Sequence, residues 1–132
     1  MPSKVVNPKP ADSADALAHF QRLLSFETDC WDVYYALHNN LHDFVLLDVR
    51  GLDTARRGYI AGAVLLPYPS INEAALQAYP DDTVFVVYCA GPHCNATEKA
   101  AIKLARLGRP VKKMIGGVTG WLDEGFKLAT ER

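Results

Sequence analysis

The sequence has no long apolar run and no apolar leader. No segment approaches the roughly 18 consecutive apolar residues that a membrane-spanning helix needs. Residues 1–10 carry three of the eight prolines and lack the apolar core of a secretory signal. We therefore expect a cytoplasmic protein with no membrane partner, in which residues 1–11 form an extended arm ahead of a single domain at residues 12–132.

Cysteine is scarce, and neither sign of charge is in excess. The count of three is odd, and Cys30 is far in sequence from Cys89 and Cys94, so we expect free thiols in a reducing compartment rather than a disulfide framework. The formal net charge of -1 provides no overall basic field for nucleic acid. With 49% hydrophobic and 22% charged residues, the 132 residues suffice for one globular core.

Short apolar runs alternate with segments of helical periodicity. The strand-like runs are residues 44–48, 63–66, 84–88 and, more weakly, 111–115. Helical spacing is found around Leu17, Phe20 and Leu24, then around Cys30, Val33, Tyr34 and Leu37, and again over residues 71–78 and 96–107. Two helices are thus expected before the first strand. The alternation predicts an α/β fold with a mainly parallel sheet and helices on both faces.

Cys89 ends the most apolar run of the chain, residues 84–88, and is followed by a loop and a helix-like segment. Ligand sites in parallel sheets form beyond the carboxyl ends of the strands, where Asp48 and Cys89 are both expected. Peptide N–H groups and the positive end of a helix dipole stabilise a thiolate in such a place. The strand alone also permits a buried cysteine that acts only as a small apolar residue.

The loop after Cys89 has the composition of an anion cradle. Gly91 can take a positive φ and curl the loop, whereas Pro92 offers no N–H. The predicted cradle is Ala90, Gly91, Pro92, His93, Cys94, Asn95 and Ala96. Its N–H groups suit an anion or a second sulfur attached to Cys89.

Three motifs follow one another along the chain. The first combines residues 47–50 (L-D-V-R) with residues 58–63 (G-Y-I-A-G-A). The second is residues 87–89 (V-Y-C) with the loop and helix after them, and the third is residues 116–121 (G-G-V-T-G-W). They resemble the D-x-R and G-H-I-P-G-A motifs, the cysteine motif and the G-G-x-x-x-W element of the single-domain rhodaneses, a family of sulfurtransferases. Each string is weak alone, but the order and spacing of all three agree with the family.

The resemblance implies a rhodanese-like fold with a sheet of four to five strands and sulfur transfer through a cysteine persulfide. Only Cys89 matches the family's catalytic position. The expected small-molecule partners are a sulfur-donor anion such as thiosulfate and a thiol or other thiophilic acceptor. A protein acceptor of sulfur is a further expected partner. The resemblance implies no metal and no organic cofactor.

The chain also departs from the family's pattern. Thr54 stands where many rhodaneses have an acidic residue, and Tyr59 stands where they have His. Cys94 occupies a position that is often basic in rhodaneses active on thiosulfate, so a guanidinium fork for an oxyanion is missing from the loop. The loop resembles a C-x-G-P-x-C-N subset of the family. The identity of the sulfur donor is therefore left undecided by the sequence.

Several neighbouring residues have two interpretations. Asp48 and Arg50 either anchor loops by ion pairing or, through Arg50, attract an anionic donor. His93 either helps to hold an anion or is solvated at the loop tip. Cys94 either acts as a resolving thiol that forms a disulfide with Cys89 or packs under the start of the helix. Trp121 and Cys30 are expected in the core.

Two other functions compete with sulfur transfer. Phosphatases of similar fold use a loop that resembles C-x5-R, but the sixth position after Cys89 is Asn95, which cannot bind a phosphoryl group as an Arg does. A weakly catalytic binding or redox-sensing module that uses Cys89 and Cys94 is the main alternative. His93 and the two cysteines lack a familiar zinc-ligand spacing.

Overall fold

The computed structural model describes residues 1–130. The strands are β1 (Glu27–Thr28), β2 (Val45–Asp48), β3 (Val64–Leu65), β4 (Phe85–Tyr88) and β5 (Val111–Met114). The α-helices are α1 (Ser13–Phe26), α2 (Cys30–His38), α3 (Leu52–Arg57), α4 (Glu73–Leu76), α5 (Ala96–Arg106) and α6 (Gly117–Asp123), and η1 (Tyr68–Ser70) is a 3-10 helix.

The five strands form one parallel sheet in the order β1-β5-β4-β2-β3, with β4 in the centre. β2 and β4 are paired in register, so that Asp48 lies opposite Tyr88 at the carboxyl end of the sheet. The predicted α/β class and parallel sheet are confirmed. The prediction that two helices precede the first strand is wrong, because β1 lies between α1 and α2 and pairs with β5.

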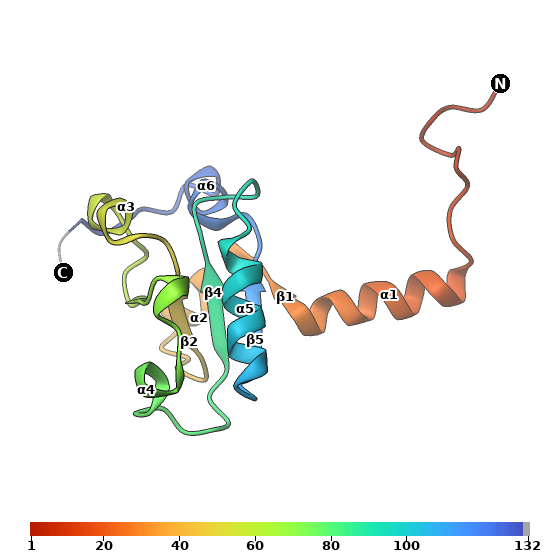
Figure 1. Cartoon of the computed structure of the whole chain (residues 1–132). Helices are drawn as coiled ribbons and strands as arrows, with labels where there is room; N and C mark the ends of the chain where they lie inside the picture. The colour runs from red at the N-terminus through yellow and green to blue at the C-terminus, as the bar shows by residue number, and fades with distance from the viewer. Residues whose placement is uncertain (131–132) are drawn as a thin grey trace.

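The sheet is covered on both faces (Figure 1). Alternation along β4 divides its side chains between two cores. Phe85, Val87 and Cys89 face α4 and α5, with Leu104 of α5 fully buried among them. On the other face the core contains Val86 and Tyr88, together with residues of α2 and α6. Cys30 and Trp121 lie in this second core, as predicted.

α1 does not join either core. Figure 1 shows it leaving the body of the molecule beside β1 and continuing into the N-terminal arm, far from the other helices. Within residues 1–130 the first buried side chain of the chain is that of Cys30, and α1 buries none. None of the helices in the described part of the chain is long and apolar enough to cross a membrane.

Candidate active site

Cys89 lies directly after the central strand, at the carboxyl end of the sheet. Its side chain is only 4% exposed and belongs to the core beneath α5. The Cys89 carbonyl accepts a hydrogen bond of 3.0 Å from the amide of Val118, which ties the strand end to α6. Cys89 is therefore held by regular structure on two sides.

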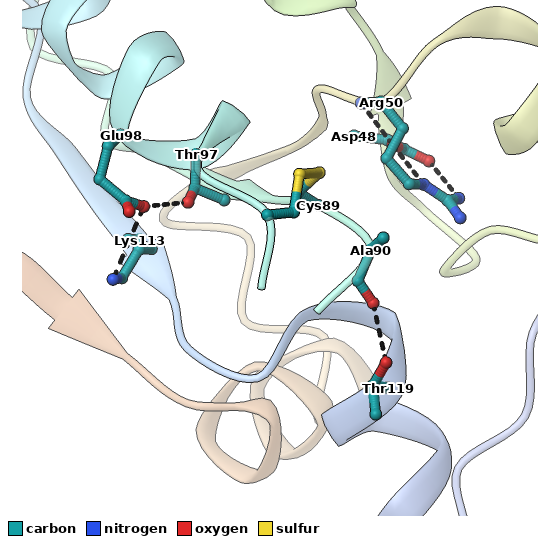
Figure 2. The surroundings of a disulfide bond; sticks show 9 residues. Asp48, Arg50, Cys89, Ala90, Thr97, Glu98, Lys113 and Thr119 are labelled. Atoms are coloured by element: carbon teal, nitrogen blue, oxygen red, sulfur yellow. Dashed lines mark hydrogen bonds and ion pairs between the residues drawn. A yellow bond between two sulfur atoms is a disulfide. The ribbon is translucent and has the colours of Figure 1, made fainter. Parts of the chain in front are cut away.

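Cys89 and Cys94 form a disulfide bond, with their Cα atoms 6.3 Å apart (Figure 2). The expectation of free thiols is wrong for these two cysteines, because the five-residue loop folds back and brings Cys94 to the strand end. The backbone supports this fold: the Cys94 amide donates to the Gly91 carbonyl at 3.0 Å. The structure thus brings together Cys89 and Cys94, whose pairing the sequence left undecided.

Gly91 has a different role from the one predicted. It does not adopt a positive φ. A Cβ at this position would lie 2.7 Å from Oγ1 of Thr119, so glycine is required by the close approach of α6. Thr119 Oγ1 also donates to the Ala90 carbonyl at 3.1 Å. The cysteine loop is therefore shaped by contact with α6 as well as by its own turn.

Gly117 makes the second close approach to the loop. It has a φ of +58°, and a Cβ there would lie 2.5 Å from the Cys89 carbonyl oxygen and 2.8 Å from the Gly91 nitrogen. Both features exclude a side chain. This contact explains why the G-G pair and the cysteine loop occur in one sequence pattern.

The remaining residues of the predicted cradle are arranged around the disulfide. Pro92, His93 and Asn95 are exposed, and Ala90 and Ala96 are half-buried. α5 begins at Ala96, so its amino end lies next to the bonded cysteines. Pro92 and Thr97 contribute to a cavity there, whereas an anion-holding role of His93 stays a prediction.

Cavities lie on both sides of the disulfide. The first, of about 130 Å³, is lined by Cys89 and Cys94 and by Thr97, Glu98 and Lys113. The second, of about 380 Å³, reaches the same cysteines from the side of Arg50 and Tyr68. There is room beside Cys89 for a small ligand from either direction.

Lys113 is a cationic residue of the site that sequence reasoning missed. Its Nζ lies 3.2 Å from a carboxylate oxygen of Glu27. It also lies 3.6 Å from a carboxylate oxygen of Glu98, which accepts a hydrogen bond from the Thr97 hydroxyl (Figure 2). The residue comes from β5, which is 24 residues along the chain from Cys89, so no local motif points to it. Only the strand order brings it to the cavity.

Asp48 and Arg50 form a buried ion pair. Arg50 Nε and Nη2 donate to the two carboxylate oxygens at 2.9 and 2.7 Å, and Nη2 also donates to the Gly58 carbonyl at 2.6 Å. Burial by itself lowers the pKa of Arg50, but hydrogen bonds and charge from Asp48 outweigh it and raise the pKa. The guanidinium is thus charged and bonded to Asp48 and Gly58 through three of its five N–H groups, which supports the anchoring interpretation.

Tyr88 completes this network from the central strand. Its hydroxyl donates to Asp48 at 3.0 Å and accepts from the Ile60 amide at 3.1 Å. Burial, followed by the charge of Asp48, raises the pKa of Tyr88 and keeps the hydroxyl protonated. The D-x-R motif, the G-Y-I stretch and the cysteine strand therefore meet in one hydrogen-bonded cluster.

Cys30 lies outside the site. It is a free thiol on α2, with Sγ 3.5 and 3.6 Å from the carbonyls of Ile115 and Gly117. Burial raises its pKa to about 11, and the charges of Asp29 and Glu124 add to the rise. This thiol is therefore protonated and unreactive near neutral pH.

Residues 33–124 match the family model of the rhodanese-like domain. The chain belongs to the rhodanese-like family. This is a sulfurtransferase-type family, and the cysteine loop described above lies within the matched residues. Among curated relatives, the uncharacterised protein YibN of Escherichia coli K12 is 35% identical over 92 residues, which make up 67% of this chain and 63% of YibN. The chain therefore spans less than two thirds of that relative.

Solved structures agree with the family. BH2092 from Bacillus halodurans is 32% identical with a TM-score of 0.86, and the match covers 89% of this chain and 86% of that one. Residues 30–132 alone cannot make up 89% of the chain, so this similarity extends into the segment that contains α1. Thiosulfate sulfurtransferase from Pseudomonas aeruginosa shares the fold, with 24% identity, a TM-score of 0.71 and coverage of 88% of this chain and 22% of that protein.

Proposed function

We propose that the protein transfers sulfane sulfur through a persulfide on Cys89. The observation that carries this proposal is the position of Cys89: it ends the central strand of a rhodanese-like domain, at the amino end of α5, between two cavities. A thiolate there is stabilised by the amino end of α5, and the adjoining cavities have room for one additional sulfur atom.

The chemistry starts from the reduced protein. Two equivalents of a small thiol reduce the Cys89–Cys94 disulfide and are themselves oxidised to a disulfide. The Cys89 thiolate then attacks the outer sulfur of a donor such as thiosulfate, the S–S bond of the donor breaks, and sulfite leaves with its electron pair. A thiol acceptor attacks the terminal sulfur of the persulfide and regenerates the Cys89 thiolate. This sequence fits a reducing cytoplasm.

The donor is expected to be a small anion. The loop reads C-A-G-P-H-C-N and contains no Lys or Arg, but Lys113 lines the cavity beside Cys89. Its charge is shared with Glu27 and Glu98, which makes it a weaker anion ligand than a free basic residue. The site therefore favours donors that need one loose ionic contact over those that need a bidentate grip.

A panel of sulfane-sulfur donors tests the function. The pre-reduced wild type, Cys89→Ser and Cys94→Ser are each incubated with a donor and an excess of thiol, and hydrogen sulfide release is measured. The proposal predicts turnover by the wild type and none by Cys89→Ser. Turnover by Cys89→Ser at the wild-type rate contradicts it.

The disulfide favours redox sensing as a second candidate function. In that case peroxide oxidises the Cys89 thiolate to a sulfenic acid, and the Cys94 thiol displaces water to form the observed bond. Brief peroxide treatment of the reduced protein, followed by non-reducing peptide mapping, separates the two functions. A rapid and thiol-reversible 89–94 bridge with no donor turnover supports sensing, and a persulfide that turns over supports transfer.

A further inference from the structure

α1 is an amphipathic helix whose apolar face is uncovered within residues 1–130. Leu17, Phe20 and Leu24 recur at the spacing that aligns them on one face, and they are 60, 62 and 73% exposed. The helix has 14 residues and buries none of them. A helix of this length is marginal in water without a packing partner.

A groove with an apolar wall lies elsewhere on the same chain. It has a volume of about 430 Å³ and lies between α2 and the amino-terminal ends of β2 and β4. Its apolar wall includes Val33, Tyr35, Ala36, Phe44, Val84 and Val86. Tyr35, which forms part of this wall, is 55% exposed.

α1 cannot fill the groove of its own chain as this chain is folded. It ends at Phe26, and β1 begins at the next residue with extended backbone. No glycine or proline occurs in residues 13–29 to reverse the chain. Lys112 Nζ donates to the Leu24 carbonyl at 2.7 Å, which fixes the direction in which the helix leaves the sheet (Figure 1).

The total surface points to a missing contact of the size of a dimer interface. The chain exposes 8841 Å². A compact monomer of 14.5 kDa is expected to expose about 6,900 Å², which leaves an excess of about 1,900 Å². The N-terminal arm and α1 contribute to this excess, since no residue before Cys30 is buried. A standard interface takes about 800 Å² from each partner.

We propose that two copies of the chain form a symmetric dimer in which α1 of each copy lies in the groove of the other. The exchange covers the apolar face of α1 and the groove in both copies. Two-fold symmetry leaves no helix and no groove of the pair uncovered. The proposal is independent of the chemistry at Cys89.

Sedimentation of the full chain across the micromolar range tests the proposal. The wild type is expected to be a dimer. Phe20→Glu/Leu24→Glu on the helix, and Tyr35→Glu in the groove, are each expected to weaken the dimer at least about 100-fold, because they place charge in an apolar contact. Ala18→Glu, on the opposite face of α1, is the matched control and should remain dimeric. All four positions are solvent-accessible in the single chain, and circular dichroism checks the fold.

Mixing the two classes of variant identifies the occupant of the groove. The Phe20→Glu/Leu24→Glu chain keeps an intact groove, and the Tyr35→Glu chain keeps an intact helix, so their mixture should form a heterodimer with one sound contact. A monomeric wild type overturns the proposal, as does a helix variant that stays dimeric. A dimeric Tyr35→Glu chain also overturns it, because the helices would then pair with each other and not with the groove. A monomeric Ala18→Glu chain overturns it as well, and so does a mixture that forms no heterodimer.

Discussion

Two cationic side chains approach Cys89 from opposite sides, and their surroundings give them different roles. Arg50 is buried against Asp48 and also donates to the Gly58 carbonyl, so three of its five N–H groups are engaged within the protein. Lys113 is half-buried and held by longer contacts to Glu27 and Glu98. At the scale of single residues, we therefore assign anchoring to Arg50 and anion attraction to Lys113.

Replacing Lys113 by Met should raise the KM for an anionic sulfur donor by about 3- to 10-fold and change kcat little, because the charge helps binding and not bond breaking. Steady-state kinetics on the reduced protein measure this effect. Lys112→Met is the matched control: the neighbouring side chain lies on the other face of the sheet, over the groove and not the cysteine cavity. Equal KM values for the two variants would contradict the role of Lys113.

Replacing Asp48 by Asn should destabilise the fold by about 3–5 kcal/mol, because it leaves the Arg50 guanidinium buried without a carboxylate. Tyr88→Phe removes one hydroxyl from the same cluster but keeps the ion pair, and should cost about 1–2 kcal/mol. Urea unfolding measures both. If both variants lower the free energy of unfolding by the same amount, the ion pair is not the main anchor of the cluster formed by Asp48, Arg50 and Tyr88.

At the scale of elements, the short α6 determines the shape of the cysteine loop. The Gly117→Ala variant combines a strained φ of +58° with a Cβ 2.5 Å from the Cys89 carbonyl oxygen, so the loop must move. We expect sulfur loading at least about 10-fold slower and a stability loss above about 2 kcal/mol. Loading rate and urea unfolding are the measurements.

Gly108→Ala provides the control for backbone strain. Gly108 caps α5 with a φ of +74°, but a Cβ there meets nothing within 4 Å. This variant should lose about 1 kcal/mol of stability and load sulfur at the wild-type rate. Comparable loading defects in both glycine variants would show that strain, and not contact with the loop, controls the site.

Most elements were predictable because their apolar periods are strong. The central strand is a continuous apolar run, α5 carries a clear period of 3.6, and Gly108 follows α5 with a positive φ. α3 was missed because its sequence is polar and only Ala55 is buried. β1 was missed because two residues show no period, and it exists only through its pairing with β5.

Site geometry was less accessible from sequence, since it depends on contacts between distant segments. The cysteine at residue 89 follows from its motifs, whereas the bond to Cys94 requires the path of the loop. The spacing of Leu17, Phe20 and Leu24 correctly indicated a helix with an apolar face. It could not show that this face is left uncovered by the rest of the chain.

For the whole molecule, the pH dependence of stability follows from a buried thiol. The pKa of Cys30 rises from 9.0 to about 11 on folding. Below pH 9 the thiol is protonated in both states, and between pH 9 and 11 only the unfolded state loses its proton. The free energy of unfolding should therefore fall by about 2–3 kcal/mol as pH rises through this window. The raised pKa of Tyr88 acts in the same direction.

Cys30→Ala should flatten part of this slope. Urea unfolding from pH 8 upward measures it, and both proteins carry Cys89→Ser and Cys94→Ser so that disulfide exchange is excluded. Slopes are compared rather than absolute stabilities, because the alanine also leaves a small cavity. Identical slopes with and without the Cys30 thiol would contradict its burial in the protonated form.

The central claim is that Cys89 carries sulfur, and intact-mass spectrometry of the pre-reduced protein after exposure to sulfane-sulfur donors tests it most directly. We predict a gain of one sulfur atom in the wild type and in Cys94→Ser. The added atom should lie on the peptide that contains residue 89, and a thiol should remove it. An adduct that survives Cys89→Ser, or the absence of any adduct with every donor, would contradict the account.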